Sequence, residues 1–173
     1  METVEIKKIG VEAIEKLQQI GTQTFFETFA EVNSEENMKE YLENNFSIEQ
    51  LTHELTNPNS AFYFAVRGTE ILGYLKVNFG EEQTELKDKN ALEIERIYVL
   101  KEFHGAKIGQ LLYDKAIQIA KKQDLNYLWL GVWEENHRAI NFYKKNGFTE
   151  FDKHIFKLGD DEQTDLLMKL TLK

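Results

Sequence analysis

One six-residue segment, HGAKIG at positions 104–109, combines residue types that suit an anionic ligand. It lies between a strand-like and a helix-like stretch, and the first amides of a helix have no partner within the helix. These amides carry partial positive charge, so a phosphate is well placed there. Gly105 and Gly109 lack a β-carbon, which lets a ligand approach the backbone, and Lys107 adds a positive charge. A tight strand-to-helix turn without a ligand explains this segment equally well on its own.

The same segment departs from two nucleotide-binding patterns. A dinucleotide fingerprint needs three glycines in the spacing G-x-G-x-x-G, and a P-loop needs Gly-Lys followed by Ser or Thr. Neither pattern occurs in HGAKIG, which disfavours a nucleotide-binding oxidoreductase. The chain also has no cysteine, which excludes disulfides, thiolate metal sites and a cysteine nucleophile.

Charge narrows the possible partners. The formal net charge of −9 argues against a nucleic-acid-binding protein. Because no stretch resembles a signal peptide or a membrane span, we expect a cytoplasmic protein without a membrane partner. Residues 27–54 carry eight glutamates and one lysine, whereas residues 96–122 carry six basic residues and two acidic ones. The first region could favour a cation and the second an anion, although solvated helix faces also explain most of these charges.

Hydrophobic periodicity predicts the elements that position these residues. We expect strands at 3–9, 91–100, 127–133, 148–158 and 163–172, with a β-hairpin over 61–79. We expect helices at 10–30, 33–46, 47–58, 105–123 and 136–147, and a mobile polar loop at 80–90. This mixture implies a central sheet with helices packed on its faces. The strand–helix–strand unit over 91–133 should be a parallel right-handed crossover, and HGAKIG lies at the ligand-binding end of such a unit.

The segments IERIYVL, HGAKIG and NHRAINFYKKNGF together resemble the GCN5-related N-acetyltransferase (GNAT) superfamily. In that family, a similar strand leads to an Arg/Gln-x-x-Gly-x-Gly/Ala loop that binds the pyrophosphate of acetyl-CoA. Here Lys107 replaces the middle glycine of the loop, and the usual arginine or glutamine has no clear counterpart. The resemblance covers residues 62–148 well. It implies one N-acetyltransferase domain over residues 1–173, with an α/β fold and a mixed, mostly antiparallel, twisted sheet of about seven strands with helices on both faces.

The chemistry implied by the resemblance is acetyl transfer from acetyl-CoA to an amine. It requires a neutral amine, a stabilised thioester oxyanion and a proton for the leaving thiolate. Tyr143 matches the tyrosine of the family motif, and its neutral phenol can donate that proton. The alternative for Tyr143 is a core aromatic residue on an amphipathic helix. Asn136 matches an asparagine that contacts CoA in the family, and it also fits a helix N-cap.

Glu93 and Glu95 are the candidate bases. In a regular strand, both side chains lie on the same face as Ile97 and Val99. A free amine with a pKa near 10.4 arrives mostly protonated, so a carboxylate could attract it and pass its proton on through water. We expect Glu95 to be the base because it is nearer the thioester, and Glu93 to contact the acceptor. Two solvated carboxylates at a strand end are the alternative.

The resemblance also implies how acetyl-CoA binds. The pantetheine arm should pair with one strand backbone as an added strand, with one amide of that strand as oxyanion donor. The implied cofactor-binding residues are Ile97, Tyr98, Val99, His104, Gly105, Ala106, Lys107, Ile108, Gly109, Asn136 and Tyr143. We expect no metal, because no carboxylate–histidine pair has ligand spacing and the family uses none.

The acceptor is predicted from the acidic N-terminal region. The stretch TFFETFAEVNSEENMKEYL is similar to a bacterial subgroup that includes spermidine/spermine N-acetyltransferases. Family structures place the acceptor beside the first two helices, so we expect a small polycation, with Glu27 and Glu31 in its site. The alternatives are another amine (an amino acid, an aminoglycoside or a protein N-terminus) and a non-catalytic acyl-CoA-binding module. Both a monomer and a homodimer are compatible with the sequence.

Overall fold

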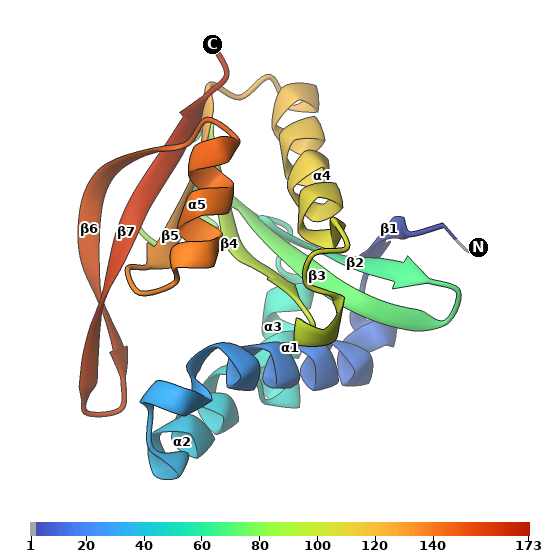
Figure 1. Cartoon of the computed structure of the whole chain (residues 1–173). Helices are drawn as coiled ribbons and strands as arrows, with labels where there is room; N and C mark the ends of the chain where they lie inside the picture. The colour runs from blue at the N-terminus through green and yellow to red at the C-terminus, as the bar shows by residue number, and fades with distance from the viewer. Residues whose placement is uncertain (1–2) are drawn as a thin grey trace.

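The computed structural model describes residues 3–173, so Met1 and Glu2, which belong to the predicted domain, lie outside the described residues. The described residues form one seven-stranded sheet and five α-helices, each at a predicted position (Figure 1). The strands are β1 (Glu5–Ile9), β2 (Ser60–Arg67), β3 (Glu70–Phe79), β4 (Ala91–Val99), β5 (Tyr127–Trp133), β6 (Thr149–Leu158) and β7 (Asp161–Thr171). The helices are α1 (Ile14–Phe29), α2 (Glu35–Asn45), α3 (Ile48–Thr56), α4 (Ile108–Lys122) and α5 (His137–Lys145). Within residues 3–173, none of the helices has the length and apolar character that a bilayer span requires.

The strands follow the order β1-β2-β3-β4-β5-β7-β6 in a twisted sheet (Figure 1). Strands β4 and β5 are parallel, and the other neighbouring strands are antiparallel. Helix α4 connects β4 to β5, which confirms the predicted parallel crossover. Helices α4 and α5 cover one face of the sheet, and α1, α2 and α3 cover the other. The α/β fold with a mixed, mostly antiparallel sheet is therefore confirmed.

The core consists of two main hydrophobic clusters, one on each face. On one face, Leu112 of α4 and Ile140 of α5 pack with Leu75 of β3. On the other, Leu17 of α1 and Leu51 of α3 belong to a cluster that also contains rings of β2 and β3. A fully buried leucine contributes roughly 1.5–3 kcal/mol to folding, so these helices are held mainly by their apolar faces.

Serine caps set the start of two helices near the site. The Ser34 hydroxyl accepts a hydrogen bond from the Asn37 N–H at 3.1 Å, and the Ser47 hydroxyl accepts one from the Gln50 N–H at 3.1 Å. Each cap satisfies an amide that the helix itself leaves unpaired and contributes about 1 kcal/mol.

Strand β4 contains a β-bulge at Glu95. In the β3–β4 register, Lys76 faces Arg96 and the next residue, Val77, faces Ile94, so Glu95 is the extra residue. A bulge displaces the alternation of the side chains that follow it. The face that a β4 side chain occupies therefore depends on which side of Glu95 it lies.

The bulge corrects the predicted arrangement of the β4 side chains. Glu93 and Glu95 both accept hydrogen bonds from Asn78. Ile97 and Val99 instead pack with the hydrophobic cluster beneath α4. The expectation that all four side chains share one face was wrong, because regular alternation ends at the extra residue.

Strands β4 and β5 pair over only a short distance. Their register runs from Ala91 opposite Tyr127 to Ile94 opposite Leu130 and ends there. On its other side, β5 continues to pair with β7 as far as Trp133. The carboxyl-terminal half of β4 is therefore unpaired along the edge that faces β5, and this opening leads into the site.

Candidate active site

A cavity of about 1080 Å³ lies at the opening between β4 and β5. Its lining comes from both faces of the sheet: the β4–α4 loop, α4 and α5 on one face, and α1, α2 and the β6–β7 hairpin on the other. Known ligand sites have volumes of roughly 300–1,000 Å³, so this cavity is large enough for a ligand with a long arm. We refer to its two ends as the loop end and the hairpin end.

The loop end is shaped by two residues in the left-handed conformation. Gly105 has a φ of +88°, and Lys107, the N-cap of α4, has a φ of +64°. Glycine adopts this region without strain, whereas a side chain makes it costly. Lys107 therefore adopts a backbone conformation that favours glycine. The turn forms even though Lys107 replaces the middle glycine of the family motif.

Most of the predicted cofactor residues line the cavity. These are Ile97, Tyr98, Val99, His104, Gly105, Lys107, Ile108, Gly109, Asn136 and Tyr143. Ala106 is the exception: it is exposed and outside the lining, and its N–H donates to the Phe103 carbonyl at 3.2 Å. The His104 ring is partly engaged as well, since its Nε2 lies 2.9 Å from the Val99 carbonyl oxygen.

Basic side chains surround the loop end. Lys101, Lys107, Arg138 and Lys145 all line the cavity there. Arg138 and Lys145 come from α5, and the sequence analysis did not select them. The available signal was Asn136, which caps α5 by accepting a hydrogen bond from the Ala139 N–H at 3.2 Å and so directs the first turn of that helix toward the cavity. Amides at a helix start and several cations together favour a phosphate-bearing ligand.

Tyr143 lies on α5 with 6% of its surface exposed, and it lines the same cavity. Burial raises the pKa of its phenol well above the ordinary value, so the hydroxyl keeps its proton at neutral pH. Its neighbour Phe142 packs edge-on against Tyr113 at a centroid distance of 5.8 Å. Both side chains line the cavity and pack in the same hydrophobic cluster, and of the two only Tyr143 adds a hydroxyl to this part of the wall.

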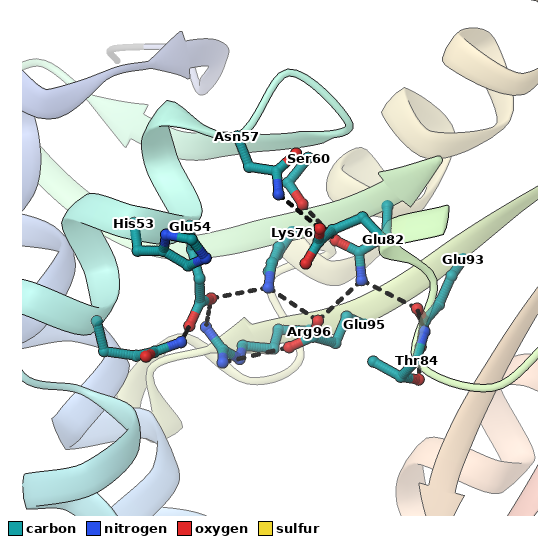
Figure 2. Close-up of polar contacts among 12 residues, drawn as sticks. His53, Glu54, Asn57, Ser60, Lys76, Glu82, Thr84, Glu93, Glu95 and Arg96 are labelled. Atoms are coloured by element: carbon teal, nitrogen blue, oxygen red, sulfur yellow. Dashed lines mark hydrogen bonds and ion pairs between the residues drawn. The ribbon is translucent and has the colours of Figure 1, made fainter. Parts of the chain in front are cut away.

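Glu95 belongs to a buried ion network (Figure 2). Lys76 Nζ lies 2.7 Å from a Glu54 oxygen and 2.8 Å from a Glu95 oxygen. Arg96 lies 3.1 Å from Glu54 and 3.2 Å from Glu95. Two acids and two bases make the network neutral. Burial opposes ionisation of Glu95, but Arg96 and Lys76 outweigh burial and lower the pKa of its carboxyl to about 2.

Glu93 lies beside this network, and no described residue forms an ion pair with it. It accepts hydrogen bonds from the Thr84 N–H at 2.8 Å, from the Thr84 hydroxyl and from Asn78 Nδ2 at 2.9 Å (Figure 2). Burial raises its pKa even though these hydrogen bonds favour the charged form. Two neighbouring carboxylates thus have pKa values displaced in opposite directions, which is a pattern typical of acid–base sites.

A profile of the acetyltransferase (GNAT) family matches residues 14–148 of the chain. The protein belongs to the GNAT family. It is 40% identical to an N-acetyltransferase from the pepI 3′ region of Lactobacillus delbrueckii subsp. lactis, with 99% of both chains covered. It is 26% identical to spermidine N(1)-acetyltransferase of Thermoplasma acidophilum, with 96% of both chains covered.

A solved GNAT structure agrees with this assignment. The PaiA N-acetyltransferase of Thermoplasma acidophilum, crystallised in complex with coenzyme A, superimposes with a TM-score of 0.80 and 26% identity. The alignment covers 98% of this chain and 99% of that one. The resemblance seen in the sequence is confirmed, and the protein is an N-acetyltransferase that uses acetyl-CoA.

Of the two glutamates near the first helices that were predicted to bind the acceptor of this GNAT enzyme, Glu27 lines the cavity and Glu31 does not. Glu27 lines the cavity, but its carboxylate accepts a hydrogen bond from the Lys101 N–H at 3.0 Å and so ties α1 to the loop end. Glu31 is exposed in the short turn after α1 and does not belong to the cavity lining. The sequence placed both near the first two helices, but only Glu27 reaches the cavity.

The hairpin end of the cavity in this GNAT fold contains groups that the sequence analysis did not assign. Its aromatic residues are Phe29, Tyr41, Trp133 and Phe156, and its titratable residues are Glu85, His154 and Asp165. They come from α1, α2, β5, the β6–β7 hairpin and the β3–β4 loop. Because no short motif contains them, only the packing of these distant elements brings them together.

Proposed function

We propose that this protein transfers the acetyl group of acetyl-CoA to a primary amine of a small molecule, and that the acceptor is a polyamine such as spermidine or spermine. The observation that carries the proposal is the continuous cavity, which joins a basic, amide-rich end to an aromatic, carboxylate-bearing end. The 26% identity to a spermidine N(1)-acetyltransferase supports the choice of acceptor.

The loop end fits acetyl-CoA. We place the pyrophosphate at the backbone amides of Gly105 and residues 107–109, with Lys107 and Arg138 as charged partners. The unpaired edge of β4 over residues 97–99 can pair with the amide groups of the pantetheine arm, as an added strand does. One amide of this edge then acts as the oxyanion donor. When bound, acetyl-CoA supplies an acetyl group already activated as a thioester.

Tyr143 is the proposed general acid. Its phenol holds a proton at neutral pH because burial disfavours the phenolate. The thiolate that leaves during acetyl transfer needs one proton, and a positioned phenol on the cavity wall can donate it.

The two candidate bases differ in their charged partners. Glu95 remains the base predicted from the sequence, but its two cationic partners make it a weak proton acceptor. We favour Glu93, which lines the cavity, has a raised pKa and has no cationic partner among the described residues. In this assignment, Glu95 stays paired with Lys76 and Arg96 and does not accept the proton.

A thiol-release assay with acetyl-CoA tests the function directly. We expect CoA to be released with spermidine and spermine as acceptors, and mass spectrometry to show one added acetyl group on the polyamine. Release with amino acids, aminoglycosides or peptide N-termini, but not with polyamines, would keep the acetyltransferase and remove the proposed acceptor. The absence of release with every amine would overturn the proposed function.

A further inference from the structure

The hairpin end of the cavity is walled by packed aromatic rings. The Phe29 ring lies 5.4 Å from the Trp133 ring and 5.9 Å from the Phe156 ring, and Tyr41 lies 5.8 Å from Phe156, all measured between centroids. These rings come from four different elements and all line the cavity. Aromatic faces attract cations, and the attraction is effective when an ammonium group lies within about 6 Å of a ring.

Asp165 of β7 lies next to these rings. Its cross-strand neighbours are Trp133 on β5 and His154 on β6, so the three residues form one row across the sheet. Gly131 of β5 lines the cavity beside Asp165; a β-carbon on it would be 3.6 Å from the nearer Asp165 carboxylate oxygen. Gly131, Leu167 and Asp165 thus form one continuous stretch of the cavity wall.

The charges around Asp165 are unbalanced. His154 Nδ1 contacts Glu85, and its Nε2 lies 3.8 Å from Asp165. One imidazole is thus shared by two carboxylates, so a net negative charge remains even when His154 is protonated. The Asp165 side chain is only 17% exposed, and burial raises its pKa to about 6 although His154 lowers it. A partly buried carboxylate without a full partner is costly, and a cationic ligand would remove that cost.

The buried ion network around Lys76, on the same face of the sheet, differs from the Asp165 region in its charge balance. There, Glu54 and Glu95 are matched by Lys76 and Arg96, with every ion pair at 3.2 Å or less. The network is complete without a ligand. Around Asp165, by comparison, the aromatic rings and the excess negative charge both favour the binding of an aliphatic cation.

We propose that Asp165 and the surrounding rings bind a second cationic group of the acceptor, an ammonium separated by a short alkyl chain from the amine that is acetylated. This inference rests on the proposed function, because the reacting amine must lie at the β4–β5 opening. Asp165 is on the strand next to β5, and His154 is one strand further. With strands about 4.8 Å apart, the two nitrogens of the acceptor should lie roughly 5–10 Å from each other.

The test compares two acceptors of nearly equal shape. In 1-aminopentane, a methyl group takes the place of the second ammonium of 1,4-diaminobutane. A charge-assisted hydrogen bond contributes about 1.5–3 kcal/mol, so we expect the wild-type enzyme to prefer the diamine by roughly 10- to 150-fold in kcat/KM. Asp165→Asn should abolish most of this preference by lowering kcat/KM for the diamine while leaving that for aminopentane nearly unchanged.

Glu162→Gln is the matched control. It removes the same charge from an exposed position on β7, where Glu162 pairs with Lys157 outside the cavity lining. We expect this variant to keep the full preference for the diamine. If Asp165→Asn does not fold, as judged by its thermal melt, Glu85→Gln on the β3–β4 loop should also reduce the preference.

The outcomes separate the two proposals. Acetylation of both amines without a preference in the wild type, or a preference that survives in both cavity variants, overturns the second-cation site and leaves the acetyltransferase function intact. A failure to acetylate either amine, together with spermidine and spermine, overturns the proposed function and this inference with it.

Discussion

Replacing Lys76 by Met should destabilise the protein strongly. The Lys76 side chain is 5% exposed, and its ammonium lies within 2.8 Å of carboxylate oxygens of both Glu54 and Glu95. In Lys76→Met, Arg96 alone would have to balance two buried carboxylates. Removing one partner of a buried ion pair costs about 3–5 kcal/mol, because an uncompensated charge stays buried. For a chain of this size, the midpoint of thermal unfolding should fall by roughly 6–20 °C.

A double variant tests whether charge balance is the cause. Lys76→Met combined with Glu54→Gln leaves one acid and one base, Glu95 and Arg96, at 3.2 Å. We expect this variant to be more stable than Lys76→Met by at least about 1 kcal/mol, since neighbours that share a network couple by roughly 0.5–3 kcal/mol. Urea unfolding followed by circular dichroism gives the free energy of unfolding. A cost below ~1 kcal/mol for Lys76→Met, or additive losses in the double variant, would refute the reasoning.

Three further results are expected. Tyr143→Phe should lower kcat by ~10²–10⁴-fold with acetyl-CoA affinity nearly unchanged; equal kcat values, with chemistry shown to be rate-limiting, would reduce Tyr143 to a packing residue. Arg138→Gln should weaken acetyl-CoA binding in calorimetry by roughly tenfold, and more so at low salt, whereas the exposed substitution His137→Gln should not. Acid should also destabilise the fold: the pKa of Glu95 lies below its unfolded value, so its contribution is complete above pH ~4.5 and is lost as pH falls to about 2. An unfolding free energy that stays constant over that range would contradict this assignment.

Local sequence patterns were sufficient to predict the elements and one end of the site. Two signals were sufficient here: the hydrophobic periodicity of α4 and α5, and the glycines of the loop at 104–109. Each signal involves residues close together in the chain, so it can be recognised without knowing the tertiary structure. The start of one helix was predicted too early. The predicted helix at 105–123 begins only at Ile108, because Gly105 and Lys107 adopt the left-handed conformation. Nothing in the residue types alone shows that Lys107 tolerates that conformation.

The other end of the site depends on pairing between distant segments. The bulge at Glu95 exists only in the register of β4 against β3, so alternation along β4 alone gave the wrong face. The ion network joins α3 to β3 and β4, and Asp165 meets Trp133 and His154 only through the β5–β7–β6 ladder. The density of glutamates near α1 was visible in the sequence, but the direction in which Glu31 points was not.

The short register between β4 and β5 also affects how the sheet holds together. Four residue pairs, Ala91 to Ile94 opposite Tyr127 to Leu130, form the ladder that joins the β1–β4 half to the β5–β7–β6 half. In the proposed complex, the pantetheine arm would be hydrogen-bonded along the free edge of β4, where this ladder ends, and would add contacts at the junction between the two halves. Opening of the two halves should then require more energy in the loaded protein: at a ligand concentration of 100 times Kd, binding adds about 2.7 kcal/mol to the free energy of unfolding. The amides of residues 96–99 should show this coupling as the largest slowing of hydrogen exchange in the sheet.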